Sequence, residues 1–309
     1  MKKLLIHLGL PKTATSTLQQ NVLQTLHDSN KVNFLGKNLE VSDKTGKVTI
    51  FNYSGKYIRD AIEEKIPFED AVKKLEAELH DDKLNIFSDE GLMVAYPGAD
   101  NLPLNRKLAN LKKLIAPYKT EVVITLREPI DYFYSLYVQL YPDFYSKIKS
   151  LNTVEKCINK FLKEPDNILF ESFLFNNYLP YLKSNFDLKV THFEDIKNNP
   201  EKYYMAWSGL LNVSPENFQT LFEKKHVNEK KKTAQGSQKV VSLNFIESKA
   251  RNLLIKAKPV FVFIKLIYNF TGLKKLFNRR VYISSVHKKP SGEALRQLKL
   301  LFESTEKNV

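Results

Sequence analysis

A short apolar run opens the chain, and a tight loop and a helix-forming stretch follow it at once. Residues 4–8 (Leu-Leu-Ile-His-Leu) are typical of a strand that is buried on both faces of a parallel sheet. Gly9 and Pro11 end this run, and a helical pattern begins near Leu18. The order strand, loop, helix predicts an α/β fold whose first loop lies at the carboxyl edge of the sheet.

The loop is rich in groups that can bind an anion. Lys12 lies within it, next to hydroxyl side chains that lead into the helix. The first backbone N–H groups of a helix lack intrahelical partners, and the helix dipole favours a negative charge there. The predicted site for a phosphate or sulfate ester comprises Gly9, Pro11, Lys12, Thr13, Ala14, Thr15, Ser16 and Thr17. From this loop alone, an ordinary capped helix after a strand remains an alternative.

A second junction of strand and helix carries another anion-binding pair. Residues 121–126 are typical of a buried strand, and Arg127 follows them directly. Pro129 suits the first turn of a helix, where its missing N–H costs nothing. Ser135, eight residues after Arg127, then lies about two turns into that helix. A guanidinium and a hydroxyl so placed can bind one anion from two sides, although an isolated Arg is more often a surface ion-pair partner.

These stretches resemble motifs of sulfotransferases that use 3′-phosphoadenosine-5′-phosphosulfate (PAPS). The pattern G-x-P-K-T-x-T-S-T-L-Q from Gly9 resembles their 5′-phosphosulfate loop, and R-x-P-x-D-x-x-x-S-x-Y from Arg127 resembles their 3′-phosphate motif. Residues 188–201 resemble the strand and turn that come next in the family, and residues 203–213 resemble the helix after them. The resemblance spans roughly residues 1–230 and is closest to bacterial-type carbohydrate sulfotransferases.

The resemblance implies a P-loop-like fold and transfer of the sulfuryl group of PAPS, which is released as 3′,5′-ADP, without a metal. Lys12 would stabilise the leaving phosphate, and Arg127 and Ser135 would bind the 3′-phosphate. The implied acceptor is a hydroxyl or amine of a carbohydrate or lipid-linked glycan. A P-loop kinase is an alternative, but Pro11 occupies the position of the second glycine of a nucleoside-triphosphate loop. A nucleotide-binding, membrane-associated protein without catalytic activity is the other alternative.

An acceptor hydroxyl requires a general base near the donor. Glu90 follows a predicted strand at residues 83–87 and should lie at the same sheet edge as Lys12. We expect Glu90 to be the base, with Asp89 pointing the other way because side chains alternate along a strand. His7 is the second candidate, although a histidine within a strand is more often a hydrogen-bonded core residue. A structural acid that caps the next turn is the simpler role for Glu90.

The remaining pattern predicts a mostly parallel sheet with helices on both faces, followed by a basic helical extension. Residues 1–245 would form the sulfotransferase-like core and residues 246–309 the extension, packed on the core or on a membrane surface. Residues 40–60 read as a polar excursion. Further predicted elements are a strand at 31–35 and helices at 18–29, 69–80, 102–118, 153–163 and 171–184.

Charge is concentrated near the end of the chain. The net charge is +14, and residues 249–292 hold eleven basic residues and no Asp or Glu. Because this segment is also rich in aromatic and aliphatic residues, it is a candidate for contact with an anionic membrane surface or an acidic acceptor, with a packed helix as the alternative. We do not expect a nucleic-acid partner. Cys157 is the one cysteine, and neither a signal peptide nor a run of about 18 apolar residues is evident, so a cytoplasmic protein is expected.

Overall fold

A computed structural model describes residues 2–41, 48–224, 239–242, 280–283 and 290–306. Its contacts divide the chain into two units. The first comprises Met1–Asn228 together with Lys289–Val309, and the second comprises Glu229–Lys288. The described part of the second unit is an antiparallel pair of strands, β8 (Lys239–Ser242) and β9 (Arg280–Ile283). The predicted boundary between residues 245 and 246, and most of the basic segment 249–292, lie outside the described residues.

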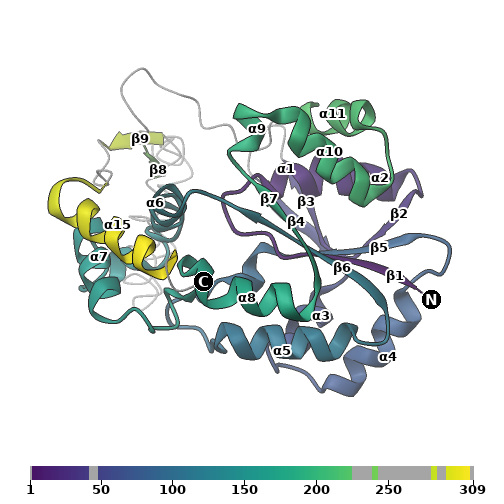
Figure 1. Cartoon of the computed structure of the whole chain (residues 1–309), viewed down its shortest axis with the longest axis horizontal. Coiled ribbons are helices and arrows are strands. Elements are labelled where there is room, and N and C mark those ends of the chain that lie inside the picture. Colours follow the sequence, from purple (N-terminus) through teal and green to yellow (C-terminus); the bar gives the residue numbers. More distant parts are fainter. Residues whose placement is uncertain (1, 42–47, 225–238, 243–279, 284–289, 307–309) are drawn as a thin grey trace, which may run out of the picture. The chain divides into compact units, whose positions relative to one another are not determined.

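The first unit is built on a parallel sheet of five strands in the order β2-β5-β1-β6-β7 (Figure 1). The strands are β1 (Lys3–His7), β2 (Val32–Phe34), β5 (Leu84–Ser88), β6 (Lys119–Leu126) and β7 (Asp187–His192). Two further strands, β3 (Lys37–Val41) and β4 (Val48–Tyr53), form a separate antiparallel pair. The predicted parallel sheet is therefore confirmed.

Helices connect the strands and cover the sheet. A continuous helical stretch after the first loop consists of α1 (Thr15–Thr17), a π-helical segment at Leu18–Leu23 and α2 (Gln24–Asp28). The longer helices that follow are α3 (Lys56–Ile62), α4 (Phe68–Glu78), α5 (Leu104–Ile115), α6 (Pro129–Leu140), α7 (Val154–Lys163), α8 (Phe175–Asn185), α10 (Pro200–Leu211), α11 (Pro215–Glu223) and α15 (Gly292–Glu306). Shorter elements are α9 (Asp195–Asn198) and the 3₁₀ turns Glu90–Met93, Tyr145–Lys147 and Glu171–Phe173.

The two faces of the sheet belong to two hydrophobic cores, because successive side chains of a strand point to opposite faces. On β1, Leu4 and Ile6 join the larger core, to which α3, α4, α5, α6, α7 and α8 contribute. Leu5 joins the smaller core, which is built with the π-helical segment Leu18–Leu23, α2, α10 and α11. As predicted, helices cover both faces of the sheet. Because β1 is therefore buried on both faces, nearly all of its side chains must be apolar.

The strand order brings three loops together. β1 lies between β5 and β6, and all three strands run in the same direction. The segments that follow them, which contain Lys12, Glu90 and Arg127, therefore leave the sheet at neighbouring points of its carboxyl edge. The predicted strands and the helices of residues 1–224 are confirmed with shifts of a few residues, the helix expected at 18–29 beginning already at Thr15.

The interpretation of residues 40–60 as a polar excursion is wrong. These residues contribute to the β3–β4 hairpin and to the start of α3. The strand signal is present, because Leu39 and Val41 alternate with polar residues and Val48–Tyr53 is rich in β-branched and aromatic residues, but both runs are short and lie among polar residues.

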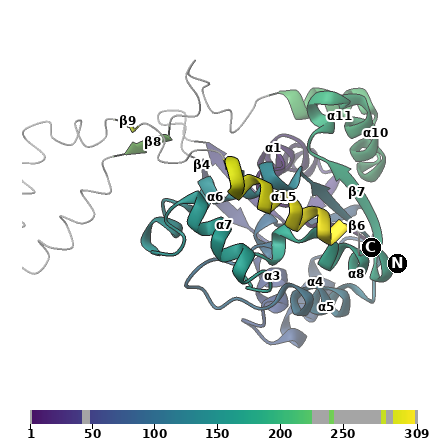
Figure 2. The ribbon, with the colours of Figure 1, turned by 60° about the vertical axis from the view of Figure 1, so that its left-hand side comes forward.

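The end of the chain returns to the core. Leu298 and Phe302 of α15 are buried there, and the ring of Phe302 lies 6.1 Å from that of Phe161 in α7. Figure 2 shows α15 crossing α6 and α7, with which it is in contact. Within the ranges given above, no helix combines the length and the apolarity that a membrane span requires.

Candidate active site

The loop after β1 has a backbone shaped for close approach to a ligand. Lys12 and Ala14 have positive φ values of 69° and 64°, although neither is glycine. When residues with positive φ alternate with residues of negative φ, successive backbone N–H groups point into the same hollow. Such a hollow binds anions. Gly9 is required for packing, because a Cβ atom there would lie 2.7 Å from Oγ1 of Thr15. The loop therefore supports the predicted anion site.

Hydroxyl side chains of the loop stabilise it through hydrogen bonds to its own backbone. Oγ1 of Thr13 donates to the carbonyl oxygen of Leu10 at 2.6 Å, and Oγ1 of Thr15 donates to the same oxygen at 3.3 Å. Thr17 is also buried, whereas Ser16 is partly exposed. The N-cap residue of α1 is Ala14, and no side chain caps this end of the helix. Thr13 and Thr15 therefore stabilise the loop by their hydrogen bonds, whereas Ser16 remains partly accessible.

Arg127 joins the two predicted motifs. Its Nη1 group donates to the carbonyl oxygen of Lys12 at 2.8 Å and to Oγ of Ser135 at 3.3 Å. The helix after Arg127 begins as expected, with Pro129 in its first turn and the Glu128 side chain accepting from the N–H of Asp131. The structure thus brings Lys12, Arg127 and Ser135 together, although Lys12 and Arg127 are 115 residues apart in sequence.

The surroundings of Arg127 leave part of its guanidinium without a protein partner. The group lies over the ring of Phe193, 4.6 Å from the ring centre, and its Nε is buried with no hydrogen-bond partner among the described residues. Burial lowers the pKa of Arg127, while the carboxylates of Asp131, Glu194 and Glu128 act in the opposite sense. An arginine remains charged under these conditions. A partly buried cation with an unused donor is suited to an anionic ligand.

Glu90 lies near the loop, where it was predicted. It is partly buried, at the start of the 3₁₀ turn that follows β5. Burial raises the pKa of Glu90 above its ordinary value; the ammonium of Lys37 opposes this rise, the carboxylate of Asp89 adds to it, and the ammonium of Lys12 opposes it. Glu90 is therefore a carboxyl group that can change its protonation state closer to neutral pH than an ordinary one.

Asp89 has a different environment and a different role. It is fully buried and accepts hydrogen bonds from Nζ of Lys37 at 2.6 Å, from the hydroxyl of Tyr53 at 2.6 Å and from Nη1 of Arg59 at 3.2 Å. It also caps the 3₁₀ turn by accepting from the N–H of Gly91 at 2.8 Å. Burial alone would raise the pKa of Asp89, but the charges of Lys37 and Arg59 and the hydrogen bonds bring it below its ordinary value. Asp89 is thus a permanent anion that anchors neighbouring elements.

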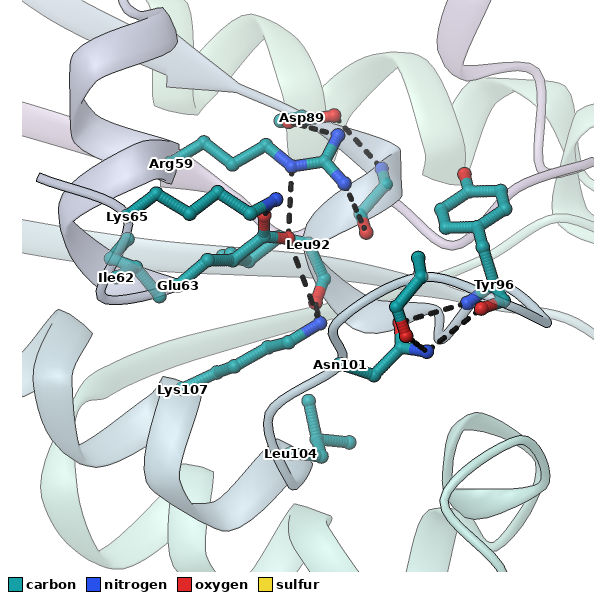
Figure 3. Close-up of polar contacts among 12 residues, drawn as sticks. Arg59, Ile62, Glu63, Lys65, Asp89, Leu92, Tyr96, Asn101, Leu104 and Lys107 are labelled. Carbon is teal, nitrogen blue, oxygen red and sulfur yellow. Dashed lines mark hydrogen bonds and ion pairs between the residues drawn. The ribbon is translucent and has the colours of Figure 1, made fainter.

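Asp89 is part of a larger network of ion pairs. Figure 3 shows Arg59 between the carboxylates of Asp89 and Glu63, and Lys107 beyond Glu63. Nε of Arg59 donates to Glu63 at 3.0 Å, and Nζ of Lys107 donates to the carbonyl oxygen of Leu92 at 3.1 Å. These contacts join α3 and α5 to the turn that carries Glu90.

The position of His7 argues against its predicted role as a base. Its Nδ1 is hydrogen-bonded to Oγ of Ser88 at 2.8 Å, and its ring meets the edge of Trp207 at 5.0 Å. Burial lowers the pKa of His7 to about 3, so the imidazole is neutral and a poor proton acceptor. The side chain of Gln19 donates to Ser88 as well, at 3.0 Å. His7 therefore belongs to a polar link between β1, β5 and the helix after the loop.

Several residues of this region were not predicted as part of the site, namely Lys37, Tyr53, Arg59 and Phe193. Phe193 lies in the stretch that resembled the family's third segment, and that resemblance was the one signal that could have drawn attention to it. Lys37, Tyr53 and Arg59 reach Asp89 from 52, 36 and 30 residues away, and no local pattern marks them. Among the residues with described positions, no group of His, Cys, Asp or Glu side chains is arranged to hold a metal ion.

Known proteins with a structure similar to this chain include two sulfotransferases. No family model and no curated protein matches the chain. A solved sulfotransferase from Alicyclobacillus acidocaldarius is similar in structure, with a TM-score of 0.42 and 16% sequence identity over 69% of this chain and 81% of that one. Mouse sulfotransferase SULT7A1, solved in complex with PAP, has a TM-score of 0.40 and 13% identity over 74% of this chain and 68% of its own. At this level, the similarity does not assign a function to the chain.

Proposed function

We propose that the protein is a PAPS-dependent sulfotransferase. The observation that carries this proposal is the double hydrogen bond of Arg127, which links the carbonyl oxygen of Lys12 in the loop to the hydroxyl of Ser135. A site for a 5′-phosphosulfate and a site for a 3′-phosphate must lie side by side to hold one PAPS molecule. The contact of the two motifs through Arg127 supports this arrangement.

In the proposed complex, the 5′ end of the donor lies against the loop at residues 12–17, and the 3′-phosphate lies against Arg127 and Ser135. Nη1 of Arg127 already contacts the loop and Ser135, and the side chain as a whole is partly exposed, so the accessible part of the guanidinium would contact the phosphate. A guanidinium edge is suited to two parallel hydrogen bonds with phosphate oxygens. The 3′-phosphate is the group that distinguishes PAPS from ATP.

In the proposed reaction, an acceptor oxygen or nitrogen forms a bond to sulfur while the bond between sulfur and the 5′-phosphate oxygen breaks. The proton of the acceptor passes to the carboxylate of Glu90, and the negative charge that develops on the leaving phosphate is stabilised by Lys12 and the loop N–H groups. The charge of Lys12 acts to lower the pKa of Glu90, and this interaction supports these roles. His7 is left out of the reaction because it is neutral and buried.

For the acceptor, we propose a hydroxyl or amine of a carbohydrate or lipid-linked glycan. Half-buried aromatic rings support this choice, because Tyr96 and Phe144 lie 5.7 Å apart and the charge of Glu90 acts on Tyr96. Such rings are suitable surfaces for the faces of sugars. We further propose a cytoplasmic enzyme whose basic segment 249–292 meets an anionic membrane surface that carries the acceptor.

Ligand-induced stabilisation tests the proposal. We expect 3′,5′-ADP to raise the unfolding temperature by several degrees, because a ligand at about 100 times its Kd stabilises a protein by about 2.7 kcal/mol. ATP with Mg²⁺ should give a smaller shift, since it lacks the 3′-phosphate. A larger shift with ATP and Mg²⁺ would favour a kinase instead. Transfer of ³⁵S from labelled PAPS to a panel of glycans and glycolipids then identifies the acceptor, and binding without any transfer would favour a non-catalytic protein.

A further inference from the structure

Gln19 is a buried polar residue in the helical stretch that follows the loop after β1. It is 2% exposed and belongs to the π-helical segment, in which Leu18, Val22 and Leu23 are members of the smaller core. A polar side chain in such surroundings destabilises a protein unless it is hydrogen-bonded. The hydrogen bonds of its amide group account for the presence of Gln19 among these apolar residues.

The amide nitrogen of Gln19 makes two hydrogen bonds to one residue, Ser88. Nε2 donates to the carbonyl oxygen of Ser88 at 3.1 Å and to Oγ of Ser88 at 3.0 Å. An amide nitrogen carries two hydrogens, so each of them has a partner in this residue. Ser88 is fully buried and ends β5, where it pairs with His7 of β1. Gln19 thus links the helical stretch to the end of β5.

The two ends of this link lie next to the two parts of the proposed site. Gln19 comes one helical turn after Thr15, which is hydrogen-bonded within the loop. Ser88 is followed directly by Asp89, which caps the 3₁₀ turn, and by Glu90, which is the first residue of that turn. A shift of the helical stretch relative to β5 would therefore change the position of the loop relative to Glu90.

The other hydrogen bonds that hold this turn lead to different elements. Asp89 accepts from Lys37 of β3, Tyr53 of β4 and Arg59 of α3, and none of these residues belongs to the helical stretch after the loop. These contacts fix the turn to the hairpin and to α3. The hydrogen bonds of Gln19 add a connection to the helix whose first turn borders the proposed donor.

We propose, on the basis of the function proposed above, that Gln19 is a positioning residue, which keeps the loop that binds the donor and the turn that carries Glu90 at the separation that sulfuryl transfer requires. The loop itself is shaped by the hydrogen bonds of Thr13 and Thr15 and by its own backbone, so donor binding does not depend on Gln19. The rate does depend on it, because a displacement of about 1 Å between reacting groups can cost about 100-fold.

Gln19→Met tests this role, because it nearly preserves the size of the side chain and removes both hydrogen bonds to Ser88. In single-turnover experiments with saturating PAPS, we expect transfer from the bound donor to slow at least about tenfold. The Kd of 3′,5′-ADP should stay within about threefold of the wild-type value, since the loss is one of alignment and not of binding. An unchanged transfer rate would overturn the proposal, and so would a loss of 3′,5′-ADP affinity as large as the loss of rate.

Asn21→Leu is the matched control. Asn21 lies in the same π-helical segment, is 8% exposed, and donates from Nδ2 to the carbonyl oxygen of Phe222 in α11 at 3.2 Å. This variant also removes a buried amide hydrogen bond from the helix, but at a contact that leads away from β5. We expect its transfer rate to stay within about threefold of the wild type even where stability falls. Equal losses of rate in Asn21→Leu and Gln19→Met would mean that Gln19 only stabilises the helix.

Ser88→Ala is a milder variant that serves if Gln19→Met does not fold. It removes the hydroxyl partner of Gln19 and keeps the carbonyl partner. Its transfer rate should fall by less than is expected for Gln19→Met, at unchanged 3′,5′-ADP affinity. A wild-type rate in Ser88→Ala, where Gln19→Met cannot be studied, would overturn the proposal.

Amide hydrogen exchange provides a test that needs no turnover. In the wild type, we expect 3′,5′-ADP to slow exchange both in residues 12–17 and in the turn at residues 90–93. In Gln19→Met, the slowing should persist in the loop and become at least about threefold smaller in the turn, which corresponds to the loss of about one hydrogen bond. Equal slowing of the turn in both proteins would overturn the role of Gln19.

The same experiment separates this role from the proposed function. A wild-type protein that binds no 3′,5′-ADP would refute the proposed function. The ligand-free proteins would then decide the link through Ser88: faster exchange of the turn in Gln19→Met than in Asn21→Leu would support it, and equal exchange would overturn it.

Discussion

Arg127→Ala is the substitution that tests the donor site most directly. Nη1 of Arg127 donates to the carbonyl oxygen of Lys12 and to Ser135, and the partly exposed part of the guanidinium is the part that we propose for the phosphate. Two charge-assisted hydrogen bonds contribute about 1.5–3 kcal/mol each. Because Arg127 is partly exposed, we take the lower end, about 3 kcal/mol in total. Binding of 3′,5′-ADP should therefore weaken by about 100-fold, as measured by titration calorimetry.

The same measurement with 5′-AMP provides the control, because this ligand has no 3′-phosphate. Its binding should weaken at most about tenfold, which is the effect of losing the hydrogen bond to the Lys12 carbonyl oxygen. Ser135→Ala keeps that bond and should weaken 3′,5′-ADP binding more mildly than Arg127→Ala. Arg127→Lys should restore little, because an ammonium cannot make two parallel hydrogen bonds.

Equal losses for 3′,5′-ADP and 5′-AMP in Arg127→Ala would refute this reasoning. They would mean that Arg127 holds the loop in place and does not contact the 3′-phosphate. Full recovery of 3′,5′-ADP affinity in Arg127→Lys would refute the two-bond geometry but not the need for a positive charge.

Lys12→Ala should lower turnover at least about tenfold more than donor affinity, because its charge matters most as the leaving phosphate becomes negative; equal losses would make Lys12 a binding residue only. Glu90→Gln should bind 3′,5′-ADP normally but transfer sulfate about 100-fold more slowly or worse, and near-normal transfer would exclude Glu90 as the base. His7 has a folded-state pKa of about 3 against an ordinary value of 6.5, so its contribution to stability is lost as the pH falls below 6.5. Urea unfolding should show that the wild type loses about 2 kcal/mol more than His7→Asn between pH 7 and pH 5, and equal losses would contradict a buried neutral His7.

The sheet and its helices could be predicted from the sequence because their signals are local. Strands that are buried on both faces are nearly continuous apolar runs, as in residues 4–8 and 121–126. Helices such as α4 and α5 repeat their apolar residues with the helical period. The β3–β4 hairpin has neither property, and it was missed.

The residues that we propose for donor binding could be named from the sequence for a similar reason. Lys12 and its hydroxyl neighbours lie within one loop, and Arg127 and Ser135 lie eight residues apart on one strand-to-helix junction. That the two motifs meet is a consequence of strand order, with β1 next to β6. The sequence could suggest this contact through resemblance and through the rule that loops gather at the carboxyl edge, but not the individual hydrogen bonds of Arg127.

The charge network around Asp89 could not be predicted, because its members come from separate elements. Gly91 shows this most clearly. A Cβ atom at this position would lie 2.5 Å from Nη1 of Arg59, so the glycine gives the guanidinium room beside Asp89. From the sequence alone, Gly91 is indistinguishable from an ordinary glycine in a turn. Only the packing of α3 against the turn after β5 gives it this meaning.

Asp89 and Glu90 illustrate how two neighbouring carboxyl groups acquire different roles. Four hydrogen bonds and two cations hold Asp89 as an anion and lower its pKa, whereas burial raises the pKa of Glu90. Environments that separate the pKa values of adjacent acids commonly mark a division between a fixed charge and a group that exchanges protons. A base must release and accept a proton in each cycle, which the fully paired Asp89 cannot do without breaking the anchor of the hairpin. His7 fails for the opposite reason, because its burial makes protonation too costly. Of these three groups, Glu90 is therefore the one that we propose for proton transfer, because its pKa is raised above the ordinary value of a carboxyl group.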